Sequence, residues 1–255
     1  MRIALVNPPF KTEYGKFSRA SRGPAIAKSG TLYYPIWLAY ACGLLEKSGH
    51  EVLLLDSCAE TLDLDVTTAR LEAFLPELVV VDTSTPSIAD DVRSAIRFKE
   101  VSSSPYVCLV GTHPSALPDE VMKMDERIDC IARREYDQTL LDLANCLSDK
   151  SSISSVAGLS YREDGKIVHT EDRPYLQDLD AIPFVSQVYK NHLHVENYFF
   201  AAGEYPMVMI MTGRGCPSHC FFASIRRRFT VTSTDCAARR MLRTNLNTSR
   251  ASSRR

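Results

Sequence analysis

The sequence lacks any long apolar run. No stretch approaches the roughly 20 consecutive apolar residues that a membrane-spanning helix requires, and the opening residues Met1–Pro9 turn polar too soon for a signal peptide. We therefore expect a cytoplasmic protein without a membrane span. Its hydrophobic content of 45% is still enough for a sizeable core.

Two glycine-rich nucleotide motifs are also absent. No G-x-G-x-x-G follows the first apolar run, so a dinucleotide site is not expected, and the absence of G-x-x-x-x-G-K-[ST] excludes a P-loop protein. The eight cysteines are scattered and do not resemble a disulfide framework. Only Cys216 and Cys220 have a spacing typical of metal ligands.

The net charge is −1, but it is unevenly distributed. Residues 224–255 contain nine arginines and one acid, Asp235, which gives this segment a net charge of +8 and leaves −9 for residues 1–223. An acidic body of this kind does not favour nucleic-acid binding. The basic segment alone could bind phosphates or a membrane surface.

Short apolar runs alternate with helical patterns over residues 1–150. The runs are rich in Val, Leu and Ile with little polar alternation, as in strands buried on both faces: Ile3–Asn7, Glu51–Leu55, Leu78–Asp82, Tyr106–Val110 and Ile128–Ala132. The helical segments are Pro35–Ser48, Asp65–Phe74, Ile88–Val101, Leu117–Lys123 and Tyr136–Leu147. This order predicts an α/β domain with a doubly wound parallel sheet of the Rossmann or flavodoxin-like kind.

Ligands of such sheets bind beyond the carboxyl ends of the strands. The residues expected there are Asn7 and Pro8 after the first strand, Thr83, Ser84 and Thr85 after the third, and Gly111, Thr112 and His113 after the fourth. Gly111 would let a ligand approach the backbone. The hydroxyls could equally cap the next helix, and His113 could be a surface histidine held in place by Pro114.

Residues 151–205 read as a hairpin followed by a linker. Val156–Tyr161 and Lys166–His169 form the two strands, with Asp164 and Gly165 at the turn. Pro206–Thr212 then predicts a buried strand that leads into the loop Gly213–Cys220. A catalytic loop after the first strand of a barrel has this layout, so residues 206–223 would begin a second domain.

Taken together, these segments resemble the N-terminal part of the cobalamin-binding radical S-adenosylmethionine (SAM) enzymes. The matching segments are Val6–Pro9, Pro35–Tyr40, Gly49–Val52, Gly111–Pro114, Leu117–Glu120, Leu179–Phe184 and Thr212–Cys220. The last of these matches the first two thirds of a C-x-x-x-C-x-x-C loop. Their order and spacing carry the resemblance more than any one segment does.

The resemblance implies three cofactors: cobalamin, a [4Fe-4S] cluster and SAM. Cys216 and Cys220 would bind the cluster as thiolates. The strand-end residues named above would contact the corrin, between the sheet and a barrel. The D-x-H-x-x-G motif that supplies a cobalt-binding histidine in other cobalamin domains is absent, so His113 is expected to touch the corrin or its tail rather than the metal. The family transfers methyl groups or performs related radical chemistry.

The sequence departs from the family pattern at the third ligand position, which is Ala223. From Ser224 onward no helical or strand period is visible, so we expect residues 224–255 to be a disordered or out-of-frame tail of a truncated or frameshifted gene. Such a chain would be catalytically impaired. Two alternatives stay open: a stand-alone cobalamin carrier without catalysis, and a flavodoxin-like domain that binds another ligand. The substrate and the oligomeric state are not fixed by the sequence.

Overall fold

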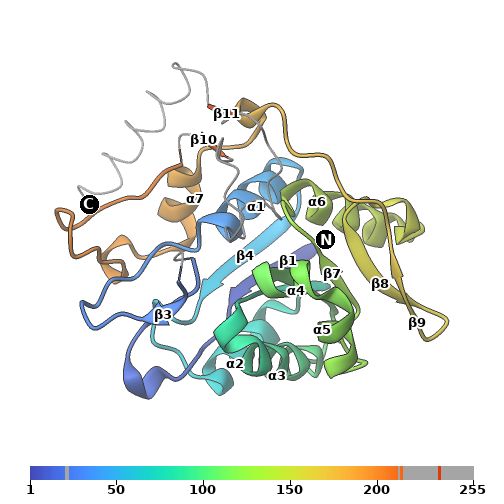
Figure 1. Ribbon diagram of the computed structural model, residues 1–255, viewed down its shortest axis with the longest axis horizontal. Coiled ribbons are helices and arrows are strands. Elements are labelled where there is room, and N and C mark those ends of the chain that lie inside the picture. Colours follow the sequence, from blue (N-terminus) through green and yellow to red (C-terminus); the bar gives the residue numbers. More distant parts are fainter. Residues whose placement is uncertain (21–22, 212, 215–234, 237–255) are drawn as a thin grey trace.

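The computed structural model describes residues 1–20, 23–211, 213–214 and 235–236, and it is built around a seven-stranded sheet (Figure 1). The strand order is β4-β1-β5-β6-β7-β8-β9. The strands are β1 (Arg2–Asn7), β4 (Glu51–Asp56), β5 (Leu78–Thr83), β6 (Tyr106–Gly111), β7 (Cys130–Ala132), β8 (Leu159–Glu163) and β9 (Lys166–His169). The first five are parallel to one another, which confirms the predicted parallel sheet.

Helices follow the parallel strands, as the sequence predicts. They are α1 (Ile36–Lys47), α2 (Leu64–Phe74), α3 (Ile88–Lys99), α4 (Thr112–Ala116), α5 (Pro118–Met124) and α6 (Asp137–Asp149). The bounds agree with prediction within a few residues. Helix α4 and the later helix α7 (Val185–His192) were not predicted, because each is short and its apolar period is hard to see.

The sheet separates two hydrophobic cores, which gives a three-layer molecule. Alternate residues of β1 enter opposite cores: Ile3 and Leu5 pack on the side of α1, α6 and α7, whereas Ala4 and Val6 pack on the side of α2, α3 and α5. The same two groups of helices lie on opposite sides of the sheet in Figure 1. Strands buried on both faces explain the continuous apolar runs in the sequence.

The hairpin predicted between residues 156 and 169 is part of this sheet. Strand β8 pairs antiparallel with β7, and β9 pairs antiparallel with β8. The sequence pattern predicts an α/β domain that ends at residue 150, whereas in the structure the hairpin beyond it extends the same sheet. Arg133, directly after β7, holds the hairpin: its guanidinium donates to Leu159 O, Ser160 Oγ (2.8 Å) and Thr170 O (2.7 Å).

Residues 206–211 do not form a strand, which corrects the prediction of a buried strand over Pro206–Thr212. The apolar side chains from Val208 to Met211 pack against the core on the α1 side instead. Tyr34 and Tyr40 donate hydrogen bonds to carbonyl oxygens of this segment, those of Met207 (2.8 Å) and Met211 (3.4 Å). The segment is apolar because its side chains pack on the core, and among the described residues no strand pairs with it. The first strand of a barrel is therefore absent from the described residues.

The segment ends at Arg214, which is buried against α1 and α6. Its Nη1 lies 2.9 Å from Asp137 Oδ2, and its guanidinium lies 5.2 Å from the ring centre of Trp37 and 5.1 Å from that of Tyr40. Gly213–Arg214 (β10) also pairs antiparallel with Asp235–Cys236 (β11). This short strand lies within residues 224–255, where no regular structure was expected. Within the described residues, no helix combines the length and apolarity that a bilayer crossing would need.

Candidate functional site at the carboxyl edge of the sheet

The site lies where the five parallel strands end. Strand β1 connects to β4 on one side and its other neighbour β5 connects to β6 on the opposite side, so the connections after β1 and β5 run in opposite directions along the sheet. In open α/β sheets, ligands bind outside the carboxyl ends of the strands at such a switch point. The two sides of this edge differ: side chains fill the β1–β4 side, and the ends of β5 and β6 present polar groups.

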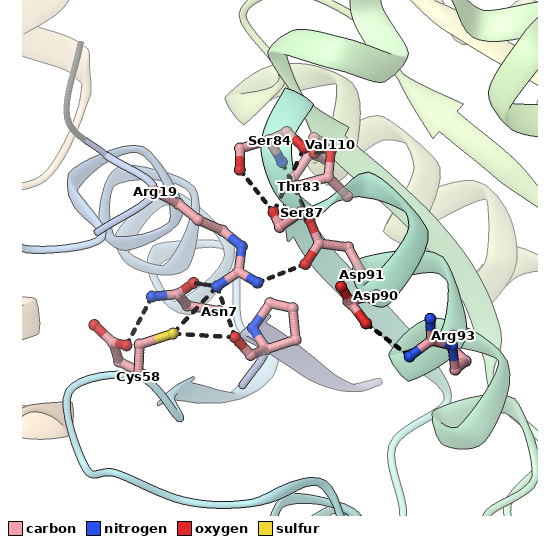
Figure 2. A network of polar contacts seen from close by, with 12 residues as sticks. Asn7, Arg19, Cys58, Thr83, Ser84, Ser87, Asp90, Asp91, Arg93 and Val110 are labelled. Atoms are coloured by element: carbon pink, nitrogen blue, oxygen red, sulfur yellow. Dashed lines mark hydrogen bonds and ion pairs between the residues drawn. The ribbon is translucent and has the colours of Figure 1, made fainter. Parts of the chain in front are cut away.

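Arg19 occupies the centre of the filled side (Figure 2). Its Nη1 donates to Asn7 Oδ1 (2.7 Å), to the Pro8 carbonyl oxygen (2.6 Å) and to Cys58 Sγ (3.2 Å). Its Nη2 lies 2.5 Å from Asp91 Oδ1, and both side chains are almost completely buried. Burial alone would lower the pKa of Arg19, but the Asp91 carboxylate, together with Cys58 and Asp82, outweighs this effect and raises the pKa above its usual value.

Asp91 is a buried acceptor on α3 that joins Arg19 to the loop after β5. Besides Arg19 it accepts hydrogen bonds from the Ser84 backbone N–H (3.2 Å) and from Ser87 Oγ (2.6 Å). Burial raises the pKa of Asp91, and the Arg19 charge together with these hydrogen bonds opposes the rise. The carboxylate thus fixes the start of α3 relative to the ends of β1 and β5.

Asp56, the last residue of β4, organises the other end of the network. It accepts hydrogen bonds from Asn7 Nδ2 (2.7 Å), the Ala59 backbone N–H (3.0 Å) and Tyr198 Oη (2.9 Å). Burial is the main cause that raises its pKa. Tyr198 comes from the segment before residue 206 and stacks on Tyr34, with ring centres 3.9 Å apart. This segment therefore covers the end of β4.

The ends of β5 and β6 carry the accessible part of the edge. Thr85 is exposed, and Thr112 and His113 are half-buried. His113 Nδ1 lies 3.4 Å from Thr85 Oγ1, which brings the loops after the two strands together. The three side chains offer hydroxyl and imidazole groups to a ligand above the sheet.

Gly111 is required by the sheet itself. Its φ of 121° is unfavourable for other residues, and a Cβ at this position would lie 2.3 Å from the carbonyl oxygen of Thr83. The glycine therefore lets the ends of β5 and β6 approach each other. The sequence pattern predicts a different role for it, the close approach of a ligand to the backbone.

The structure brings all eight predicted strand-end residues to one edge and divides them into two groups. Asn7, Thr83 and Ser84 are buried and hydrogen-bonded within the chain. Asn7 bonds to Asp56 and Arg19, Thr83 donates to Val110 O, and Ser84 bonds to Ser87. The Pro8 carbonyl oxygen accepts from Arg19. Thr85, Gly111, Thr112 and His113 keep exposed surface. Contact of any of them with a corrin stays a prediction.

Sequence reasoning missed Arg19, Asp56 and Asp91. Asp91 did carry a signal, because it lies on the apolar face of α3 between Ile88 and Ala95, where an acid needs a buried partner. Arg19 lies in an irregular segment, and no local pattern marks it. The predicted cluster ligands Cys216 and Cys220 lie outside the described residues.

Comparison with known proteins finds similarity to a cobalamin-binding family within this chain. Residues 23–144 match the family model of the B12 binding domain. An uncharacterised methyltransferase of Pyrococcus horikoshii is 29% identical over 229 residues, which cover 90% of this chain and 46% of the relative. The anaerobic magnesium-protoporphyrin IX monomethyl ester cyclase of Rubrivivax gelatinosus is 28% identical over 229 residues, covering 88% and 38% respectively. The chain thus spans less than half the length of these two relatives.

A solved structure shares the fold. The cobalamin-dependent SAM radical enzyme OxsB, with aqua-cobalamin and SAM bound, superposes with a TM-score of 0.73 at 16% identity, covering 99% of this chain and 32% of that one. The chain therefore resembles the cobalamin-dependent radical SAM enzymes in fold, and its residues 23–144 match the B12 binding domain family model.

Proposed function

We propose that this chain binds cobalamin at the carboxyl edge of its parallel sheet, over the ends of β5 and β6. The observation that carries the proposal is the uneven edge: the Arg19 network fills the β1–β4 side, and Thr85, Thr112 and His113 present polar groups beside it. The match of residues 23–144 to the B12 binding domain supports the same ligand.

The residues at this edge fit a corrin. Its periphery carries amide side chains, which hydroxyl and imidazole groups can bind as donors or acceptors. The buried Arg19–Asp91 pair joins the end of β1 to the loop after β5, so a flat ring would rest on the edge rather than enter between the strands. When bound, cobalamin would supply a carrier for a methyl group. The protein's own part is to hold and orient the ring.

His113 is proposed to contact the corrin or its tail without ligating cobalt, because the chain lacks the D-x-H-x-x-G motif. Its Nδ1 already lies 3.4 Å from Thr85 Oγ1. The test is titration of the protein with hydroxocobalamin, followed by gel filtration and visible spectroscopy. His113→Ala should weaken binding about tenfold, as expected for the loss of about 1.4 kcal/mol of polar contact, and leave the cobalt spectrum unchanged.

The exposed His194 provides the matched control, and His194→Ala should bind like the parent. An altered cobalt spectrum in His113→Ala would contradict the proposed contact. Failure of the parent to retain hydroxocobalamin at micromolar concentration would remove the proposed function itself.

We further propose that any catalysis by this chain is radical methyl transfer or related chemistry, which would need an iron–sulfur cluster. We propose that the chain binds this cluster poorly. Ala223 stands where a third thiolate ligand is expected after Cys216 and Cys220. Anaerobic iron–sulfide reconstitution should give a labile cluster or none, and Ala223→Cys should raise the iron content. Equal, stable iron loading of parent and variant would contradict this.

The same alanine favours a second candidate function, a cobalamin-binding module without catalysis of its own. Reconstitution distinguishes the two candidates. Cobalamin retention with no cluster, even in Ala223→Cys, supports the module; a stable cluster supports the enzyme.

A further inference from the structure

Helices α1 and α7 meet at three side chains that can each ligate a metal. Cys42 and Glu46 are four residues apart on α1 and therefore share one face. His192 is the last residue of α7. The helices approach closely, because a Cβ on Gly43 would lie 3.0 Å from Val188 of α7, and Figure 1 shows α7 beside α1.

The three ligand atoms converge on one point. His192 Nε2 lies 2.7 Å from Glu46 Oε1 and 3.7 Å from Cys42 Sγ, and the three atoms all lie within 4.8 Å of one another. Cys42 is completely buried, and the side chains of His192 and Glu46 are 13% and 33% exposed. The cluster therefore lies at the margin of the core, with one side open to solvent.

A single imidazole nitrogen faces both the thiol and the carboxylate. Nε2 has either one hydrogen or one lone pair, so it can serve only one of these two partners well. A cation between the three groups would bind all of them. The 2.7 Å contact between Nε2 and Glu46 Oε1 is that of a hydrogen bond, and the thiol at 3.7 Å is the weaker partner, which a shared ion would also bind.

We propose that Cys42, Glu46 and His192 form a site for a divalent transition metal, with Zn²⁺ as the preferred ion. Sulfur, nitrogen and carboxylate oxygen are the donors of zinc sites, with Zn–S near 2.3 Å and Zn–N near 2.0–2.1 Å. Tetrahedral geometry with these lengths places the sulfur and nitrogen roughly 3.5 Å apart, close to the observed 3.7 Å. The partly exposed Glu46 carboxylate must move outward by about half an ångström to complete the set.

Metal binding here has two chemical consequences. The Cys42 thiol gives its proton to solvent as the thiolate binds the ion, so uptake of one Zn²⁺ releases a proton from this residue. Three protein ligands leave a fourth position for water. The ion would also fasten α7, and with it the segment that covers the end of β4, to the B12-binding domain. The inference does not depend on whether the chain binds cobalamin.

The test uses the full chain, free of cobalamin, with Cys216, Cys220 and Cys236 replaced by alanine to remove competing thiols. Titration with Co²⁺ should give one equivalent of bound metal with a thiolate-to-cobalt charge-transfer band, and Zn²⁺ should displace it. Cys42→Ser in the same background should abolish the band. Cys146→Ser, which alters a half-buried cysteine on α6, should leave it unchanged.

Two further variants separate ligation from folding. His192→Gln should weaken Co²⁺ binding by at least about tenfold with an unchanged far-ultraviolet circular dichroism spectrum. Glu46→Gln, at a partly exposed position, should weaken binding about tenfold while the thiolate band persists. A parent background without a thiolate band, or equal metal affinity in the Glu46→Gln and His192→Gln variants and the parent, would overturn the site.

Discussion

Replacement of Asp91 by asparagine should be among the most destabilising single changes in this chain. Arg19 and Asp91 form an ion pair of 2.5 Å with side-chain exposures of 1% and 0%. Asparagine keeps the shape of the side chain and removes its charge. The Arg19 guanidinium would then remain buried without a directly paired carboxylate among the described residues, and only the more distant Asp56 and Asp82 would offset its charge.

The magnitude follows from the cost of an uncompensated buried charge. Breaking a buried pair by removing one partner typically costs about 3–5 kcal/mol. The neighbouring residue gives a matched control, because Asp90 pairs with Arg93 at 2.6 Å on the surface, with side-chain exposures of 34% and 72%. An exposed helical pair of this kind contributes about 0.5 kcal/mol or less.

The assay is urea denaturation at neutral pH, followed by far-ultraviolet circular dichroism, for Asp90→Asn and Asp91→Asn. The double variant Arg19→Met/Asp91→Leu removes both charges and should be more stable than Asp91→Asn alone. If Asp91→Asn lowered the free energy of unfolding by no more than Asp90→Asn does, the Arg19 network would not hold the edge together as described.

Three further predictions concern other parts of the fold. Burial raises the pKa of Asp82 to about 7, although part of the residue is exposed. The folded state therefore keeps this proton to higher pH than the unfolded state does, and the contribution of Asp82 to the free energy of unfolding falls as pH rises from about 4 to 7. Asp82→Asn should consequently stabilise the fold by about 2 kcal/mol more at pH 8 than at pH 5. A pH-independent effect in urea denaturation would contradict this. Tyr198→Phe should cost about 1–2 kcal/mol by removing a donor to buried Asp56, and an unchanged midpoint would argue against that bond. Arg133→Met should speed amide hydrogen exchange in β8 without affecting β1, whereas equal acceleration in both strands would indicate global unfolding.

The sequence predicted the parallel sheet well, because its central strands are buried on both faces. A run such as Leu78–Thr83 needs no partner to be recognised, since its composition already reflects two apolar surroundings. The same rule failed for residues 206–211, which are equally apolar but pack on the core without entering a ladder. Apolar composition records burial, and burial alone does not specify hydrogen-bonded pairing.

The candidate site was predicted in position but not in detail. Strand ends are local features, so the loops after β1, β5 and β6 could be assigned to one edge. The partners at that edge are distant in sequence: Arg19 and Asp91 are 72 residues apart, and Asp56 and Tyr198 are 142 apart. No local pattern encodes such pairs.

By itself, the sequence determined the alternation of strands and helices, the hairpin turn at Asp164 and Gly165, and the alanine at residue 223, because each depends on neighbouring residues or on residue identity. Only the tertiary structure decided which polar side chains are consumed in the Arg19 network, which remain accessible at the ends of β5 and β6, and that Cys42 and Glu46 meet His192. Those outcomes depend on how distant segments pack, and packing is a property of the whole chain.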